Sequence, residues 1–389
     1  MDHLGYLSRG RSRHRPRDAA HLYDGPYPFI QTGDVKHAGL YITDYQQTYS
    51  EAGLEQSRLW PAGTLCITIA ANIADTAILG FEACFPDSVI GFIPNEKKAD
   101  ARFVKYLFDV TIQRRVQQFT QGAAQDNLSQ EKLLSIELSV PNVNEQARIA
   151  DILSAYDDLI GNNCRRIALL EEAARQIYHE WFVRLRFPGH EHTRIANGVP
   201  EGWDAKTLGD LCEEVRETVK PDAIEPDTPY IGLEHMPRRS ISLSEWGTAE
   251  QVTSSKHRFR EGEILFGKIR PYFHKVGVAF VDGAASSDAI VIRPFEPTLR
   301  GFVLMTVSSD PFVAVAAQTM KEGSKMPRAD WKQMEAYPMP LPSVGLLNSF
   351  ERAIQAIVKQ LSTLTFAGHK LRAARDLLLP RLMSGEITV

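Results

Sequence analysis

The chain has 389 residues and a formal net charge of −4; 43% of its residues are hydrophobic and 24% are charged. This length predicts two or three domains that each bury a core, and the composition is that of an ordinary soluble globular protein. No run of about 18 apolar residues occurs and no apolar leader follows Met1, so we expect no membrane partner and a cytoplasmic protein. The four cysteines lack metal-site spacing and are expected to be reduced thiols. The net charge gives no indication of a nucleic-acid partner, so the evidence for or against such a partner must come from the distribution of charge along the chain.

The first feature in chain order is an arginine-rich segment. Five arginines occupy alternate positions, at Arg9, Arg11, Arg13, Arg15 and Arg17. Alternate spacing cannot form one face of a helix, so a mobile arm or an extended loop is predicted. Arginine suits both phosphate and the guanine edge, which favours contact with a polyanion; a solvated terminus is the alternative.

The rest of the first half has the pattern of a compact domain that mixes strands and helices. Short strands between turn residues are predicted at Leu65–Ile69, Ala77–Phe81 and Val89–Ile93, followed by a helix at Arg102–Phe119. A polar loop then carries Gln121, Gln125 and Asn127. Because Gln and Asn pair bidentately with adenine, this loop is a candidate base-reading element, with a plain surface turn as the alternative.

A long helix is predicted at residues 141–189, with Asn144 as its N-cap. Alternate steps of four and three residues form a seam at Ile149, Leu153, Tyr156, Ile160, Asn163, Ile167, Leu170, Ala174, Ile177 and Trp181. This heptad spacing is typical of helices that pair in a coiled coil, and packing against a domain core is the alternative.

The second half repeats this order of elements after a polar linker at residues 190–200. Strands are predicted at Ile264–Phe266, Val276–Val281 and Ala289–Ile292, a helix at Phe302–Met320, and a second long helix at residues 341–389. Its seam is Phe350, Ile354, Ile357, Leu361, Leu364, Gly368, Leu371, Arg375, Leu378 and Leu382. Asn163 in the first seam, and Gly368 and Arg375 in the second, interrupt the apolar pattern, and such positions can fix helix register.

Basic residues gather around the strand at Ile264–Phe266. The cluster comprises Lys256, Arg258, Arg260, Lys268, Arg270 and Lys275, with Tyr272, Phe273 and His274 between them. A later loop adds Lys321, Lys325 and Arg328, where the first half has its Gln- and Asn-containing loop. Lys and Arg pair with guanine, so corresponding loops with different polar chemistry suit two domains that read different sequences.

Fixed landmarks indicate a duplication. The pairs Gly122 and Gly323, Pro141 and Pro342, and Ile30 and Ile231 are each 201 residues apart, a period too long for a solenoid. We predict an α/β (α+β) fold with a pseudo-two-fold repeat. Two similar domains, at residues 1–140 and 201–340, are separated by two long antiparallel coiled-coil helices. The first repeat lacks a counterpart of residues 198–206, so either the true start lies upstream or this domain closes differently.

No catalytic or metal site is predicted. The sequence contains neither a phosphate-binding G-x-x-x-x-G-K-[ST] loop nor a G-x-G-x-x-G motif after a strand. Asp87, Glu96 and Lys98 have the outline of a nuclease site, but the second half has Ser287, Glu296 and Thr298 at the corresponding positions.

The order of these features resembles the specificity (S) subunits of Type I restriction–modification systems. The resemblance rests on the stretches Tyr27–Val35, Leu138–Pro141 followed by Glu145-Gln146, Gly202-Trp203 before Leu208-Gly209, Leu265–Tyr272, and Leu382–Ile387. It covers nearly the whole chain, and the order of the motifs is more specific than any one of them. Two departures are the missing Gly-Trp entry of the first domain and Leu346-Leu347 in place of the Glu-Gln pair.

The resemblance implies a non-catalytic subunit that reads a bipartite site in double-stranded DNA, one half per target-recognition domain. It implies two methyltransferase (M) subunits and restriction (R) subunits as partners. S-adenosylmethionine, ATP and Mg are then expected on those partners, with no cofactor on this chain. The candidate DNA-binding residues are Arg9, Arg11, Arg13, Arg15, Gln31, Thr32, Gln121, Gln125, Asn127, Lys268, Arg270, Tyr272, Lys321, Lys325 and Arg328.

Two other functions stay open. A related defence or modification system could use the same recognition module with different partners, which a genome neighbourhood without methyltransferase and translocase genes would favour. The second alternative is an enzyme with an unrecognised site, such as a nuclease or lyase. Metal-dependent cleavage by the purified chain would favour this alternative.

Overall fold

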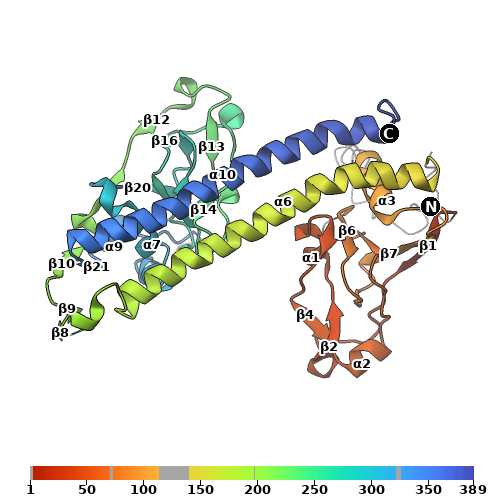
Figure 1. The fold of residues 1–389 in the computed structure, drawn as a ribbon, viewed down its shortest axis with the longest axis horizontal. Coiled ribbons are helices and arrows are strands. Elements are labelled where there is room, and N and C mark those ends of the chain that lie inside the picture. The colour runs from red at the N-terminus through yellow and green to blue at the C-terminus, as the bar shows by residue number, and fades with distance from the viewer. Residues whose placement is uncertain (1–2, 71–72, 114–139, 197, 321–325) are drawn as a thin grey trace. The chain divides into compact units, whose positions relative to one another are not determined.

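The computed structural model describes residues 3–70, 73–113, 140–196, 198–320 and 326–389. The chain forms two compact units, one of Met1–Asn162 with Gly368–Val389 and the other of Asn163–Ala367. The boundary crosses both long helices, α6 (Val143–Tyr178) and α10 (Val344–Met383). Each unit therefore combines one β-rich domain with a part of each helix (Figure 1).

The first unit contains a five-stranded mixed sheet. Its strand order is β1 (Gly5–Arg9), β7 (Val89–Pro94), β5 (Leu65–Thr68), β6 (Thr76–Leu79) and β3 (Tyr41–Ile42). Only β3 and β6 run parallel; the other neighbours are antiparallel. Every residue of β5 and β6 is buried, which explains why their sequences are apolar runs and not alternating patterns. A separate ladder pairs β2 (Tyr23–Phe29) with β4 (Gln47–Tyr49), and the short helices are α1 (Thr32–His37) and α2 (Glu51–Glu55).

The second unit repeats the five-stranded sheet. Its order is β11 (Cys212–Val215), β20 (Ala289–Pro294), β17 (Ile264–Gly267), β18 (Val276–Ala279) and β14 (Ser242–Leu243). Again only the last pair is parallel. The two sheets match strand for strand, so the duplication inferred from the sequence is confirmed as a duplication of topology.

The second unit also has strands outside this sheet. A further sheet contains β12 (Thr218–Val219), β16 (Lys256–Phe259), β19 (Gly283–Ala285), β13 (Pro229–Ile231) and β15 (Gly247–Thr248). Two ladders pair β8 (Ile195–Ala196) with β9 (Val199–Pro200), and β10 (Asp204–Thr207) with β21 (Pro338–Leu341). Part of the expected linker is thus a hairpin, and β10 overlaps the stretch at residues 198–206 that lacks a counterpart in the first repeat.

The prediction of one helix at Phe302–Met320 is wrong. Two helices, α7 (Arg300–Val307) and α8 (Asp310–Gln318), occupy this segment, and the chain bends by 70° between them. Ser309 caps α8 through the amide of Phe312, and Pro311 in its first turn cannot continue the preceding helix. In the first unit, α3 (Ala101–Phe108) continues into a π-helical turn at Asp109–Gln113, and the rest of the predicted helix lies outside the described residues.

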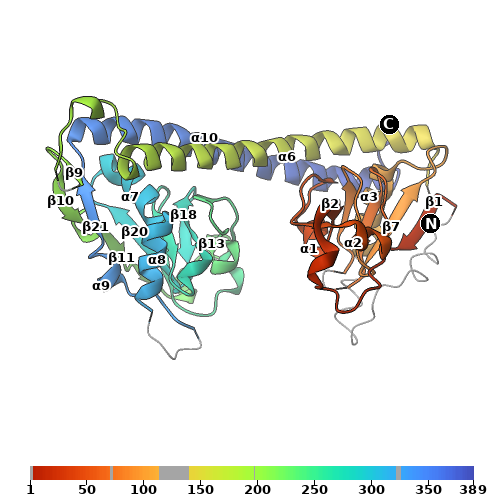
Figure 2. The same cartoon turned by 90° about the horizontal axis from the view of Figure 1, so that it is seen from below.

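Both α7 and α8 contribute to the core of the second unit, and Figure 2 shows α7 next to the long helices of that unit. A short helix, α9 (Trp331–Met334), lies between α8 and β21 in the chain. No single described helix is long and apolar enough to cross a membrane; the bent pair Pro297–Val307 and Asp310–Gln318 passes by length and composition only.

The long helices pair through the predicted seams within each unit. In the first unit, Ile149 and Leu153 of α6 share a core cluster with Leu382 of α10. In the second, Ala174 of α6 shares a cluster with Ile357 of α10. Rising numbers on α6 meet falling numbers on α10, so the pairing is antiparallel. Every seam position of both helices is buried or half-buried.

The start of α6 differs from the prediction. Asn142, and not Asn144, caps the helix, because its side-chain oxygen accepts a hydrogen bond from the amide of Glu145 at 3.1 Å. The Asn142 amide nitrogen in turn donates to the Glu145 carboxylate at 3.4 Å. The three-residue spacing between Asn and Glu is that of a reciprocal cap, and this signal was present in the sequence.

Arg375, an interruption of the second seam, forms a buried ion pair across the helices. Its guanidinium donates to Asp157 of α6, whose side chain is only 7% exposed. The other oxygen of Asp157 accepts a hydrogen bond from the hydroxyl of Tyr106 on α3. Burial, and then the Asp157 charge, raise the pKa of Tyr106, so this hydroxyl remains a donor. The network joins α3, α6 and α10 of the first unit at one point.

Each unit also ties its domain to a helix through a buried polar group. In the first unit, Gln146 is fully buried and donates to the carbonyls of Lys98 and Pro141. Leu347 stands at the corresponding place in α10 and packs into the second core instead. In the second unit, Glu351 of α10 accepts a hydrogen bond from the amide of Gly301 at 2.6 Å. The departure from the Glu-Gln pair therefore replaces a polar contact with an apolar one.

We predict that Arg375→Ala destabilises the first unit by about 3 kcal/mol, because it leaves the buried Asp157 carboxylate without its cation. The matched control is Arg381→Ala on the same helix, whose pair with Glu386 is about half-exposed and is expected to contribute less than about 1 kcal/mol. Urea unfolding monitored by circular dichroism measures both. Equal effects of the two substitutions would contradict the assignment of a buried pair.

Candidate nucleic-acid interface

Three basic residues of the second domain are brought together by two backbone hydrogen bonds. The amide of Arg270 donates to the carbonyl of Pro327 at 3.1 Å, and the amide of Ala329 donates to the carbonyl of Lys268 at 2.8 Å. Arg328 lies between these bonds. The loop that follows β17 and the loop that follows α8 therefore form one surface, although the bonded residues Arg270 and Pro327 are 57 positions apart in the chain.

The backbone around Arg270 presents an aromatic ring to solvent. Arg270 and His274 both have left-handed backbone conformations, with φ of 47° and 54°, and they bracket a 3-10 turn at Pro271–Phe273. Tyr272 in that turn is 54% exposed, a large fraction for a ring of this size. An exposed ring between cations can stack on a base or sugar.

Two other basic residues predicted around β17, Lys256 and Lys275, make backbone contacts instead of joining this surface. Lys256 is buried, and its ammonium group donates to the carbonyl and hydroxyl of Ser254. Lys275 donates to the carbonyl of Leu233. Proximity in sequence was misleading here, because β16 belongs to a different sheet from β17.

A basin of about 390 Å³ lies beside Lys268 and Arg328, with Arg216, Glu214 and Trp331 also in its wall. Two cations of the basin are paired: Arg216 with Glu214 at 2.6 Å and Arg328 with Asp288 at 3.0 Å. Burial, and next the charge of Lys268, lower the pKa of His257. Lys268 thus lies close enough to His257 for its charge to act on that imidazole.

In the first domain, the arginine-rich segment is extended and attached to the domain, and it is not a mobile arm. Arg9 ends strand β1, and the amide of His14 donates to the side chain of Gln56 at 3.0 Å. The hydroxyl of Ser57 donates to the carbonyl of Arg11 at 2.8 Å. Gly10 and Ser12 are buried and His14 is half-buried, whereas the five arginines, Arg9, Arg11, Arg13, Arg15 and Arg17, are exposed. The alternate spacing therefore places the arginines on the solvent side of an extended chain.

Three of these arginines have structural partners. Arg9 donates from Nε to the backbone carbonyl of Asp87 at 3.0 Å. Arg15 donates to the carbonyls of Ser12 and His14 in its own loop. Arg17 donates to both carboxylate oxygens of Asp87 at 2.9 Å. The Asp87 carboxylate, which belonged to the disfavoured outline of a nuclease site, is thus engaged by an arginine.

The remaining predicted residues are only partly placed. Gln31 caps helix α1 with Asp34 and donates from its amide to the side chain of Gln47; Thr32 is the first residue of that helix. Gln121, Gln125, Asn127, Lys321 and Lys325 lie outside the described residues. The structure thus brings together Lys268, Arg270, Tyr272 and Arg328 in one domain, and Arg9 to Arg17 in the other.

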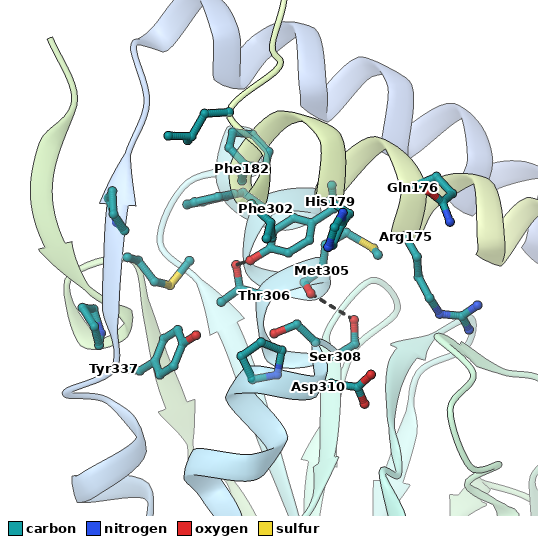
Figure 3. Close-up of a pocket in the computed structure, with 18 of the residues that line it drawn as sticks. Arg175, Gln176, His179, Phe182, Phe302, Met305, Thr306, Ser308, Asp310 and Tyr337 are labelled. Atoms are coloured by element: carbon teal, nitrogen blue, oxygen red, sulfur yellow. Dashed lines mark hydrogen bonds between the residues drawn. The ribbon is translucent and has the colours of Figure 1, made fainter. Parts of the chain in front are cut away.

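A cavity of about 630 Å³ in the second unit contains the residue types of a hydrolase but not the geometry (Figure 3). His274 faces the carbonyl of Ser308 at 2.7 Å and Asp310 at 3.4 Å. The hydroxyl of Ser308 donates instead to the carbonyl of Met305 at 3.3 Å. No ring nitrogen of His274 is therefore placed to activate that hydroxyl.

Other centres of covalent or metal chemistry do not appear among the described residues. They contain no group of three or more His, Cys, Asp or Glu side chains that could hold a metal ion. Burial raises the pKa of Cys84 to about 11 and that of Cys212 to about 12, so neither thiol is an activated nucleophile.

Comparison with known proteins shows which family the chain is similar to. Residues 9–172 match the family model of the Type I restriction modification DNA specificity domain. A Type I restriction enzyme MjaIX specificity subunit of Methanocaldococcus jannaschii is 22% identical over 94% of this chain and 88% of its own length. The EcoDI specificity subunit of Escherichia coli is 24% identical over 43% of this chain and 37% of its own length.

Residues 9–172 therefore match a Type I specificity domain, and the chain is similar to Type I specificity subunits over most of its length. The solved structure of an S subunit from M. genitalium has the same fold, with a TM-score of 0.58 and 15% identity over 98% of this chain and 94% of that chain. Within the family fold, two residues that sequence analysis overlooked now stand out. Asp288 was not considered, and Asp87 was weighed for the wrong chemistry. Their arginine partners are distant in sequence, so no local pattern could reveal the pairs.

Proposed function

We propose that this chain reads a bipartite site in double-stranded DNA, with one target-recognition domain for each half-site. The observation that supports this most strongly is the repetition of one sheet topology in two units, each completed by the same two helices. Both domains place exposed arginines beside the strands of the repeated sheet. Specificity subunits are non-catalytic recognition subunits, so the chain itself performs no methylation or cleavage.

The proposal includes the partners and cofactors of such a complex. Two methyltransferase subunits dock on the helices and methylate adenine with S-adenosylmethionine, and restriction subunits that use ATP and Mg join them. The formal net charge of −4 is compatible with DNA binding, because partner subunits can supply part of the phosphate contact. A helix of 36 residues is about 54 Å long, which suits a spacer between two half-sites about one DNA turn or more apart.

A domain exchange tests the assignment of one domain to one half-site. Replacing residues 1–140 with the first domain of another family member is expected to change one half of the methylated motif and preserve the other. The measurement is a genome-wide map of methylated adenine in cells that carry the partner genes, and cells without this gene serve as the control. A motif that changes in both halves contradicts the assignment, and the absence of any bipartite motif contradicts the function.

The basic surface of the second domain generates a further prediction. Arg270→Ala, Lys268→Ala and Arg328→Ala are each expected to weaken DNA binding, by about 1–3 kcal/mol at one base position for a base contact. A phosphate contact would instead weaken all sequences alike and reduce the salt dependence. Fluorescence anisotropy with cognate and substituted duplexes separates these outcomes. Lys220→Ala, an exposed lysine outside this surface, is the control, and unchanged affinity in all three variants would refute the assignment.

The spacer role is tested by changing helix length. Seven residues inserted after Gly161 preserve the heptad phase and add about 10 Å, or about three base pairs. The methylated motif is expected to keep both halves and gain unspecified base pairs between them. A four-residue insertion at the same place shifts the seam out of phase and is expected to lower stability. An unchanged gap after the seven-residue insertion would show that the helices do not set the spacing.

A further inference from the structure

In each recognition domain, a carboxylate immediately before one strand of the repeated sheet holds an arginine from a distant segment. Asp87 precedes β7 by two residues and accepts both of its hydrogen bonds from Nη2 of Arg17 at 2.9 Å. Asp288 directly precedes β20 and accepts from Nε of Arg328 at 3.0 Å. Strands β7 and β20 occupy the same place in the two sheets. The same loop thus carries an ion pair in both domains.

The two arginines have different origins in the chain. Arg17 lies 70 residues before its partner, in the arginine-rich segment, whereas Arg328 lies 40 residues after its partner, in the loop that follows α8. Neither partner is at an equivalent position, because Asp87 corresponds to Ser287 and Asp288 corresponds to Ser88. The two pairs therefore arose separately at one loop, which indicates that the pair itself is useful there. An accidental contact copied by duplication would keep both partners at equivalent positions.

Folding stability does not account for these pairs. The side chains of Arg17 and Asp87 are 48% and 40% exposed, and those of Arg328 and Asp288 are 49% and 26% exposed. Ion pairs this accessible to water contribute little to the stability of a folded protein. A functional role is the better explanation.

The pairing favours a base over a phosphate as the target. A phosphate is bound best by an unpaired cation, and a neighbouring carboxylate both cancels that charge and repels phosphate oxygens. Guanine, in contrast, presents two acceptors, O6 and N7, to two parallel N–H groups of an arginine. A carboxylate that fixes the guanidinium in one orientation reduces the rotamer entropy lost on binding and selects the base edge that can approach.

The guanidinium atoms left for such a contact differ between the two arginines. Within the described residues, the hydrogen bonds of Arg328 use only Nε, so Nη1 and Nη2 are left for a ligand. Those of Arg17 use Nη2 and leave Nε and Nη1, which point in different directions, so Arg17 offers guanine a single N–H donor and not a parallel pair. The pair in the second domain lies at the edge of the 390 Å³ basin beside Lys268, which can contact the adjacent phosphate.

We propose that Arg17 and Arg328 each read one guanine, in the half-site of their own domain, and that Asp87 and Asp288 are the residues that position them. This inference rests on the proposed function, because it specifies how each domain reads its half-site. It predicts at least one guanine at a fixed position in each half of the recognised motif.

The experiment uses the full chain with its methyltransferase partner and two parallel substitutions, Asp288→Asn and Asp87→Asn. Asp288→Asn is expected to reduce discrimination for one guanine in the second half-site by about 5- to 150-fold and to leave the first half-site intact. Asp87→Asn is expected to do the reverse. Arg328→Lys keeps the charge but loses the two-pronged donor, so it should relax the same guanine as Asp288→Asn. Competition binding with duplexes substituted at each position provides the readout, and the salt dependence is expected to stay unchanged.

The outcomes separate the two levels of the proposal. A wild-type complex that recognises no bipartite motif overturns the proposed function, and this inference with it. A wild-type complex with a bipartite motif, but with no guanine relaxed in the variants, overturns the inference alone. Uniformly weaker binding to every duplex with a shallower salt dependence also overturns it, because that result identifies a phosphate contact. Thermal melting of each variant confirms that the fold is intact.

Discussion

The structure depends on the burial of two apolar seams that neither helix can bury alone. In the first unit, α6 and α10 complete a core that also contains Phe103 and Val104 of α3. In the second, Phe350 and Ile354 of α10 lie in one cluster with Phe302 of α7. Each such side chain stabilises the fold by about 1.5–3 kcal/mol when it leaves water. A recognition domain is therefore not a separate globule attached to a rod, because the helices form part of its core.

This shared core explains why buried polar residues on the helices are few. An apolar seam by itself tolerates displacement by a heptad, since Leu and Ile interchange at small cost. A buried carboxylate does not, because it is costly away from its partner. Asp157 meets Arg375 and Tyr106, and Glu171 accepts from the amide of Ser242 and the hydroxyl of Ser240. Such groups specify one alignment of helix and domain at little net gain in stability.

The helices, strands and duplication could be predicted from periodicity in the sequence, whereas contacts between distant loops could not. The heptad seams, the short apolar strands and the 201-residue offset gave the fold, because each depends on residues near in sequence or on exact repetition. The break between α7 and α8 was missed because apolar residues continue on both sides of Ser309. The structure brings Arg328 beside Lys268 and Arg270, a contact between distant loops, whereas Lys256 was wrongly grouped with them, since strand adjacency is not sequence adjacency.

Duplication followed by divergence gives the two domains one sheet topology, here called the frame, and different side chains on its surface. The frame is conserved in topology because its residues are buried, where a change in shape disturbs many neighbours at once. At the edge of the frame, replacement is easier: Gln146 anchors one domain with hydrogen bonds, and Leu347 anchors the other with apolar contact. The exposed loops are freer still, since a half-exposed pair such as Arg17 with Asp87 contributes little to folding. Recognition can therefore change in one domain without loss of stability in either, and a subunit built this way acquires new specificities one half-site at a time.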